Sequence, residues 1–175
     1  MGDEAGTPDP DAVVLMELVG VRVELPTNTP IVLLREVDGD HRVLPIFIGG
    51  PEATAIAFAL EDVETPRPMT HDLMRDLLAD LGATVERVVV TDLQEGTFYA
   101  EIHLDVAGEA HQVSARPSDA VALAVRTGTT IYAAEAVVDE AAQVVGDDED
   151  PAEEEEVVEE FRRFIDDVNP EDFAS

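Results

Sequence analysis

Between residues 13 and 134 the chain twice shows the same order of local patterns, three strand-like runs followed by an alanine-rich helical segment. The runs are rich in Val, Ile and Leu and are separated by turn residues, which is typical of β-hairpins. Hairpins combined with few helices favour an α+β fold with a mixed, mainly antiparallel sheet and packed helices over a doubly wound parallel sheet. The runs predicted as strands are 13–24, 31–37, 42–48, 84–93, 97–106, 111–115 and 129–134.

Three helices are predicted: one from Pro51 to about Glu61, one that follows Thr70 and runs to Leu81, and one that Ser118 opens and that runs to about Arg126. The first and third are rich in alanine, whose small side chain allows close packing, and we expect both to be buried. Segments 44–60 and 112–126 share the order strand, proline-containing turn with an acidic residue, alanine-rich helix. We therefore hypothesise that a β-β-β-α unit is duplicated within the chain.

The acidic residues define the expected domain boundaries. The chain has 40 acidic residues and 10 basic residues, with a formal net charge of −30, and much of this charge lies near its ends. We expect a disordered acidic N-terminus over 1–12, one domain over 13–138, an acidic linker over 139–156, and a C-terminal amphipathic helix and tail over 157–175. The apolar positions of that last helix, which we expect to pack on its own domain or on a neighbouring subunit, are Val157, Phe161, Phe164, Ile165 and Val168.

Composition excludes several kinds of chemistry. The chain has no cysteine, so disulfides, zinc–thiolate sites, iron–sulfur clusters and thiol catalysis are excluded. The net charge opposes nonspecific binding to nucleic acid or to anionic membranes, so binding of a polyanion requires a local arginine patch or a divalent metal. The first residues lack the cationic start of a secretory signal, and no apolar run is long enough to span a bilayer. We expect a cytoplasmic protein without membrane contact.

Two similar segments lie at predicted helix starts, Arg-Pro-Met-Thr-His-Asp at 67–72 and Arg-Pro-Ser-Asp at 116–119. Glu52 has a similar place in the first helix. A structural interpretation makes Thr70 and Ser118 the N-caps and places the acids in first turns, where the helix dipole favours negative charge. A functional interpretation places the two helix starts opposite each other as the walls of one cleft.

In that cleft, Arg67 and Arg116 would bind a phosphate or carboxylate through their planar guanidinium groups. Four further side chains would bind a divalent cation or transfer protons, namely His71, Asp72, Asp119 and Glu52. Capping alone does not explain why arginine precedes proline twice, or why a histidine stands beside the first aspartate.

Five blocks in this order resemble the bifunctional nuclease domain family: LPIFIG (44–49), EA (52–53), RPMTHDL (67–73), GTFYA (96–100) and ARPSDAVALA (115–124). The resemblance covers about residues 13–138. It implies a self-associating α+β domain, with DNase and RNase activity in some members. Many members have an aspartate where this chain has Ser114, so one acid that could join a metal site is absent. The family's shared polar residues correspond to Glu52, Arg67, Thr70, His71, Asp72, Arg116, Ser118 and Asp119.

Two functions remain open from the sequence. The first is a metal-assisted nuclease in which Glu52, Asp72 and Asp119 hold Mg²⁺ or Mn²⁺ and His71 acts as a base or orients water. Its substrate-binding residues would be Arg67, Arg116, Thr70 and Ser118. The second is a noncatalytic homo-oligomeric module that binds a small anionic ligand or a protein partner. The charge balance fits the second hypothesis better, and the family resemblance favours the first.

Overall fold

The computed structural model describes residues 12–145, which form seven strands and four helices. The expected acidic N-terminus up to residue 11, the linker from residue 146 and the C-terminal helix lie outside the described residues. None of the helices between residues 12 and 145 is long and apolar enough to cross a lipid bilayer. In chain order the elements are β1 (Val13–Glu24), β2 (Thr29–Glu36), β3 (Val43–Phe47), α1 (Gly50–Leu60), α2 (Thr70–Asp80), β4 (Ala83–Gln94), β5 (Thr97–Val106), β6 (Glu109–Ala115), α3 (Pro117–Thr127), β7 (Thr130–Ala134) and α4 (Glu135–Ala141).

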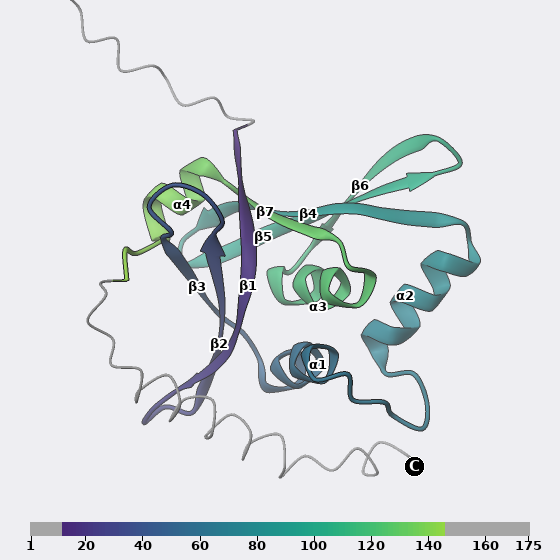
Figure 1. The fold of residues 1–175 in the computed structure, drawn as a ribbon, viewed down its shortest axis with the longest axis horizontal. Helices are drawn as coiled ribbons and strands as arrows, with labels where there is room; N and C mark the ends of the chain where they lie inside the picture. The colour runs from purple at the N-terminus through teal and green to yellow at the C-terminus, as the bar shows by residue number, and fades with distance from the viewer. Residues whose placement is uncertain (1–11, 146–175) are drawn as a thin grey trace, which may run out of the picture.

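All seven strands belong to one sheet, in the order β3-β2-β1-β7-β4-β5-β6. Neighbouring strands are antiparallel except for the parallel pair β4 and β7. The α+β class and the mixed, mainly antiparallel sheet predicted from the hairpin pattern are therefore confirmed. Figure 1 shows α1 and α3 side by side within the bend of the sheet, and α4 outside that bend.

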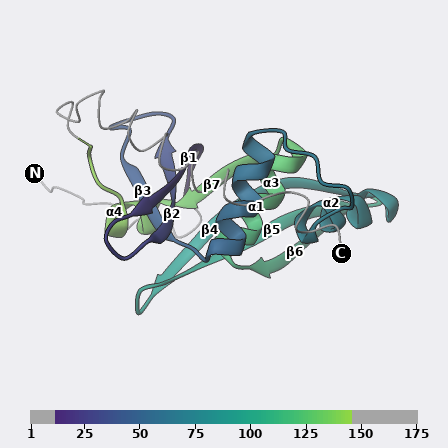
Figure 2. The same cartoon turned by 90° about the horizontal axis from the view of Figure 1, so that it is seen from below.

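The order of three strands and a helix occurs twice in the structure, as β1-β2-β3-α1 and as β4-β5-β6-α3. The two three-stranded groups lie on opposite sides of β7, so β3 forms one edge of the sheet and β6 forms the other. Figure 2 shows β3 and α4 at one end of the molecule and α2 at the other. The order predicted from the sequence is confirmed, and α2, β7 and α4 are additions to it.

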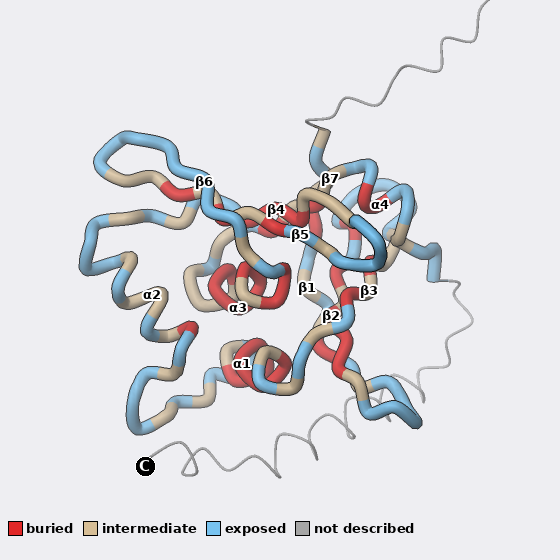
Figure 3. Tube along the Cα trace, turned by 180° about the vertical axis from the view of Figure 1, so that it is seen from behind, coloured by how far each residue is buried: buried red, intermediate tan, exposed pale blue. Residues whose placement is uncertain are grey.

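The two alanine-rich helices are buried, as predicted (Figure 3). Their small side chains allow α1 and α3 to pack against each other and against the sheet, because alanine keeps two backbones close together. Large aliphatic side chains from the strands and helices fill the remaining space. The largest fully buried ones include Leu34, Leu44, Ile56 and Leu123.

Helix α4 is an element that the sequence analysis did not predict. It follows β7 without a turn, and its Val137 and Val138 are buried. Directly after it, Gln143 and Val43 exchange two backbone hydrogen bonds of 2.8 and 2.9 Å, which attaches the chain to the free edge of β3. Acidic residues flank these two valines in the sequence. Because of those acids, the residues from 139 onward resemble a linker in the sequence.

Arg42 joins α4 to the β2–β3 hairpin. Its backbone N–H and its Nε donate to Glu36 Oε2, Nη2 donates to Oε1, and Nη1 donates to Asp139, at 2.8–2.9 Å. Glu36 is only 4% exposed, so it depends on Arg42 to stay ionised. Hydrogen bonds from the Arg42 side chain outweigh the effect of burial and lower the pKa of Glu36.

Arg42→Ala should therefore lower the free energy of unfolding by about 2–3 kcal/mol, because it leaves a buried carboxylate without its partner. Arg35→Ala is the matched control, since Arg35 on the same hairpin forms an exposed ion pair with Glu17. The control should cost less than about 1 kcal/mol. Urea denaturation of both variants measures the difference, and equal losses would contradict a structural role for the Glu36–Arg42 pair.

Candidate active site

The N-termini of α1, α2 and α3 supply the polar residues singled out by the sequence. Glu52, Asp72 and Asp119 each occupy the third residue of their helix. Carboxylates are favoured there because the first N–H groups of a helix lack partners within the helix and carry partial positive charge. Equivalent positions in three helices thus present three carboxylates, but their partners differ.

The predicted N-caps are wrong by one and two residues. Helix α2 begins at Thr70 and α3 begins at Pro117, so the N-caps are Met69 and Arg116. Proline is favoured at the first position of a helix because it has no N–H to satisfy there, which places the start of α3 before Ser118. Thr70 is exposed and Ser118 is buried, and neither forms a side-chain cap.

Arg116 connects two of the predicted carboxylates. Its Nε donates to Asp119 Oδ2 at 2.8 Å, and its Nη2 donates to Asp119 Oδ1 at 3.1 Å and to Glu52 Oε1 at 2.9 Å. The Arg116 side chain is 64% exposed, whereas those of Glu52 and Asp119 are mostly buried. We call Glu52, His71, Arg116 and Asp119 the helix-mouth cluster.

His71 links α2 to this cluster. Its Nε2 lies 2.8 Å from Asp119 Oδ1, and the residue is only 7% exposed. Burial raises the pKa of Asp119, but hydrogen bonds from Arg116 and His71 outweigh that effect and bring the pKa below its usual value. Because an ionised carboxylate only accepts hydrogen bonds, Nε2 of His71 carries the proton in this contact.

The Glu52 carboxylate is held against the backbone at the start of α1. A Cβ atom built on Gly49 would overlap Glu52 Oε2, so only glycine allows this position of the carboxylate. Oε1 accepts from Arg116, while Oε2 accepts no hydrogen bond within the described part of the chain. Glu52 therefore has one oxygen available to a ligand.

Asp72 does not join the helix-mouth cluster. Its Oδ1 accepts from Arg126 Nε at 2.8 Å, and its Oδ2 accepts from the Met69 N–H at 3.0 Å. Arg126 is nearly buried and also donates to the carbonyls of Ala55 and Ala122, at 2.9 Å each. This one guanidinium ties together α1, α2 and α3, which makes the contacts of Asp72 structural.

Sequence reasoning missed Arg126. The sequence did contain a sign of its role. Arg126 is the basic residue in the last turn of α3, a helix whose buried residues are mostly apolar. Burial raises the pKa of Asp72, yet the hydrogen bonds from Arg126 and Met69 outweigh it and leave that pKa lowered.

The lowered pKa values predict a loss of stability in acid. A carboxylate whose pKa is lower in the folded state contributes stability above its unfolded pKa and loses it as the pH falls through the folded value. The ordinary values are 4.5 for Glu36 and 3.8 for Asp72 and Asp119. The melting temperature should thus stay constant from pH 7 to about pH 5 and fall at lower pH. Glu36→Gln should weaken this dependence, and a flat profile down to pH 3 would contradict it.

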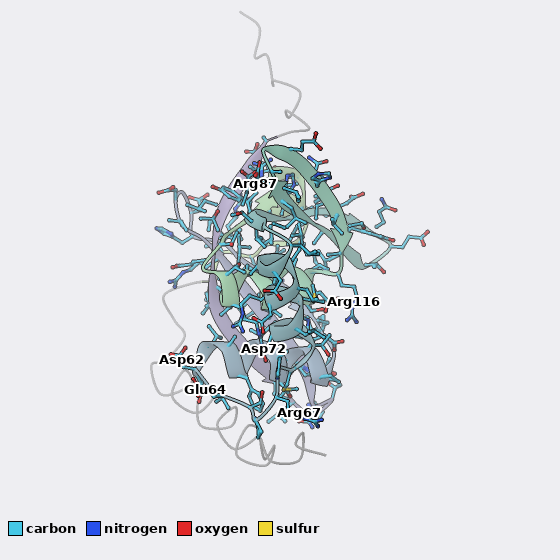
Figure 4. All side chains as sticks on the ribbon, turned by 90° about the vertical axis from the view of Figure 1, so that its right-hand side faces the viewer. Asp62, Glu64, Arg67, Asp72, Arg87 and Arg116 are labelled. Atoms are coloured by element: carbon cyan, nitrogen blue, oxygen red, sulfur yellow. The ribbon has the colours of Figure 1, made fainter. Side chains whose placement is uncertain are left out.

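Arg67 is not part of the contacts that hold the helix-mouth cluster together. It lies exposed in the connection between α1 and α2, where the Thr65 hydroxyl donates to its backbone carbonyl at 2.6 Å. Figure 4 shows Arg67 and Arg116 on separate parts of the surface. The structure therefore brings together Glu52, His71, Arg116 and Asp119 from the predicted residues, while Arg67 and Asp72 lie outside the cluster.

The donor set can be compared with what a divalent cation requires. In residues 12–145 no three His, Asp or Glu side chains are arranged as metal ligands. Two carboxylates, however, converge on one positively charged nitrogen of Arg116. Mg²⁺ is commonly held by one or two carboxylates and keeps several waters, and Mn²⁺ also prefers oxygen ligands. Glu52 and Asp119 thus fit a water-rich ion, provided that Arg116 moves away from them.

Comparisons with known proteins identify the family of this chain. A family model described as the bifunctional nuclease domain matches residues 32–146, which include all four residues of the helix-mouth cluster. An uncharacterized protein of Mycobacterium tuberculosis (strain CDC 1551 / Oshkosh) is 51% identical over 164 residues, covering 91% of this chain and 98% of that protein.

Plant proteins match a shorter part of the chain. Bifunctional nuclease 2 of Arabidopsis thaliana is 29% identical over 107 residues, which cover 58% of this chain and 32% of the plant protein. Bifunctional nuclease 1 of Oryza sativa subsp. indica is 26% identical over 98 residues, covering 54% of this chain and 30% of the plant protein. The similarity to the plant nucleases is therefore confined to one region of those longer chains.

Proposed function

Because the chain belongs to the bifunctional nuclease domain family, we propose that it hydrolyses phosphodiester bonds of DNA and RNA at the helix-mouth cluster. One observation carries this proposal. Polar residues from three separate helix starts meet at a single exposed arginine, Arg116, which binds Glu52 from 64 positions away and Asp119, the partner of His71. Stability alone does not require this convergence, because Arg126 already ties the same three helices together.

The charges of the cluster favour participation of a metal. Two carboxylates share one guanidinium, so carboxylates outnumber the arginine where a phosphate would approach, and without a metal they oppose that approach. Glu52 and Asp119 would hold Mg²⁺ or Mn²⁺, and the bound ion would polarise the phosphoryl group and lower the pKa of a coordinated water. The same charges disfavour the alternative of a noncatalytic anion-binding module.

Arg116 is the residue best placed to bind the scissile phosphate. Its side chain is mostly exposed and carries a planar set of donors that matches two phosphate oxygens. Thr70, exposed at the first residue of α2, adds a hydroxyl donor, and free N–H groups at the helix starts add further donors. Arg67 would contact the nucleic acid away from the scissile bond.

Hydrolysis forms a bond between a water oxygen and phosphorus and breaks the bond from phosphorus to the leaving oxygen. Glu52 Oε2, which has no hydrogen-bond partner within residues 12–145, accepts the proton of the attacking water. The leaving oxygen takes a proton from solvent. His71 holds Asp119 in place through Nε2, and because it is buried we assign it a positioning role.

The proposal is tested with labelled single-stranded DNA and RNA in Mg²⁺, in Mn²⁺ and in EDTA. We expect cleavage with a metal and none in EDTA. Protein carrying Asp119→Asn, purified in the same way, detects a contaminating nuclease. Cleavage that is unchanged in that variant, or absent with every metal, would overturn the proposal. Binding of inorganic phosphate without any cleavage would support the anion-binding module instead.

Gly49→Ala should reduce cleavage while leaving the fold intact. The new Cβ displaces the Glu52 carboxylate from its position beside Arg116, and displacement of a reacting group by about 1 Å can cost up to about 100-fold in rate. The free energy of unfolding should change by less than about 1 kcal/mol, because the displaced atoms end a flexible side chain. Gly50→Ala is the matched control, since a Cβ there meets nothing within 4 Å. Equal cleavage rates for the two variants would contradict the role of Glu52.

A further inference from the structure

Arg116 covers most of the carboxylate oxygens that a divalent cation would use. Its Nη2 donates to Glu52 Oε1 and to Asp119 Oδ1, and its Nε donates to Asp119 Oδ2. Asp119 Oδ1 also contacts His71 Nε2. Among contacts within residues 12–145, Glu52 Oε2 alone of these four oxygens accepts no hydrogen bond. Departure of the guanidinium would free Glu52 Oε1 and Asp119 Oδ2 as well.

Burial and neighbouring contacts indicate which partner can move. The Arg116 side chain is mostly exposed, whereas the side chains of Glu52 and Asp119 are mostly buried. His71 also holds Asp119, and the Glu52 carboxylate lies against the backbone of Gly49. Figure 4 shows Arg116 at the surface of the molecule. The guanidinium can therefore leave while the two carboxylates keep their positions.

Movement of Arg116 has a free-energy cost. Hydrogen bonds between a guanidinium and a carboxylate are stronger than those between neutral groups. Those with Asp119 and then Glu52 raise the pKa of Arg116 above its ordinary value. A cation that binds alone has to break these contacts, because it needs the same oxygens. A phosphate that binds Arg116 alone has to break them as well, because it needs the same donors.

We propose that Arg116 closes the cation site of the helix-mouth cluster and that a phosphate bound by Arg116 opens it, so that a divalent cation and a phosphodiester each strengthen the binding of the other. When both ligands bind, the contacts of Arg116 are broken only once. Such coupling is reciprocal, because each ligand lowers the Kd of the other by the same factor. The inference rests on the proposed function for the cation at Glu52 and Asp119.

A second source of coupling has to be separated from this one. A cation and a phosphate attract each other directly, and this attraction strengthens the binding of both whatever Arg116 does. Closure by Arg116 makes a further demand, since the cation should bind weakly when no phosphate is present. Variants of Arg116 should relieve that weakness, whereas direct attraction alone predicts no such relief when the charge at position 116 is kept.

The first test measures the coupling in the wild-type full chain at physiological ionic strength. The probes are Mn²⁺, followed by the electron paramagnetic resonance of the free ion, and a non-hydrolysable dinucleotide phosphonate, followed by calorimetry. Saturating dinucleotide should lower the Kd for Mn²⁺ by about 5- to 150-fold, and saturating Mn²⁺ should lower the Kd for the dinucleotide equally. The chain has 40 acidic residues, so Asp119→Asn provides the background of Mn²⁺ bound outside the cluster.

Two variants of Arg116 test its part in the coupling. Arg116→Lys keeps the positive charge but lacks the planar fork of donors that spans both carboxylates. Without dinucleotide it should bind Mn²⁺ at least about five-fold more tightly than the wild type, and the dinucleotide should then strengthen that binding less. Arg116→Gln, which also removes the charge, should show both changes at least as strongly.

Arg75→Gln is the matched control for these variants. Arg75 forms an exposed ion pair with Asp76 outside the helix-mouth cluster. Its replacement should leave both Kd values within about two-fold, because salt screens distant exposed charges. Circular dichroism confirms that each variant is folded.

Three results would overturn the proposal. The first is an equal affinity of wild type and Arg116→Lys for Mn²⁺ without dinucleotide. The second is a dinucleotide effect that both Arg116 variants retain in full, which would assign the coupling to direct attraction. The third is the absence of Mn²⁺ binding above the Asp119→Asn background under every condition.

The proposed nuclease function can fail separately from this inference. Coupled binding that depends on Arg116, without cleavage of DNA or RNA in Mn²⁺, would contradict the nuclease and support the coupling. Cleavage by a protein whose affinity for Mn²⁺ does not depend on Arg116 would contradict the coupling and support the nuclease.

Discussion

Asp119→Asn should lower the rate of phosphodiester cleavage by at least about 100-fold while leaving the protein folded. The substitution keeps the shape of the side chain but removes the charge that holds Arg116 and the Nε2–H of His71. It also removes one of the two carboxylates proposed to hold a metal. We expect the loss in kcat more than in KM, because Arg116 remains available to bind the phosphate. Cleavage of labelled RNA in Mn²⁺ under saturating substrate measures it.

Asp76→Asn is the matched control for this variant. Asp76 also lies on a helix and pairs with an arginine, Arg75, but it is exposed and outside the helix-mouth cluster. Its replacement should leave the rate within about two-fold. If both variants lost activity equally, the loss would reflect the overall charge of the protein, and the assignment of Asp119 would be wrong.

Arg126→Met should cause the largest loss of stability, about 3–5 kcal/mol in the free energy of unfolding. Methionine fills much of the same volume, but the carboxylate of Asp72 loses its partner and the carbonyls of Ala55 and Ala122 lose their donor. The three helices that carry the candidate site would then be joined by fewer polar contacts. Chemical denaturation followed by circular dichroism measures the change.

Two further variants separate the causes of this loss. Arg75→Met removes an exposed arginine from α2 and should cost less than about 1 kcal/mol. Adding Asp72→Asn to Arg126→Met should recover part of the stability, because the uncompensated charge is removed with it. A double variant that is less stable than Arg126→Met alone would show that Asp72 is stabilised by something other than Arg126.

The elements that could be predicted from the sequence are those specified by local patterns. Turn residues such as Asp38, Gly39 and Gly108 separate the hairpin strands, and alanine spacing marks the two buried helices. Helix α4 was missed because a helix of seven residues carries too short a pattern, and acids obscure its two buried valines. The start of α3 was misplaced because Pro117 is the first residue of the helix, ahead of the serine that resembles a cap.

The candidate site could also be predicted in part from local sequence patterns. Repeated acids at helix starts suggested a common location, and His71 does meet Asp119 although 48 positions separate them. The sequence did not indicate which arginine each carboxylate would pair with. Because the three carboxylates occupy equivalent helix positions, nothing distinguished Asp72 as the partner of Arg126. The exposed position of Arg67 likewise depends on the path of the α1–α2 connection.

Anomalous diffraction from crystals soaked with Mn²⁺ and a non-hydrolysable dinucleotide tests the central claim most directly. We expect a manganese peak between the carboxylates of Glu52 and Asp119, with Arg116 turned from them toward a phosphate. Manganese bound elsewhere, together with an Arg116 still bridging both carboxylates, would contradict the assignment of catalysis to this cluster.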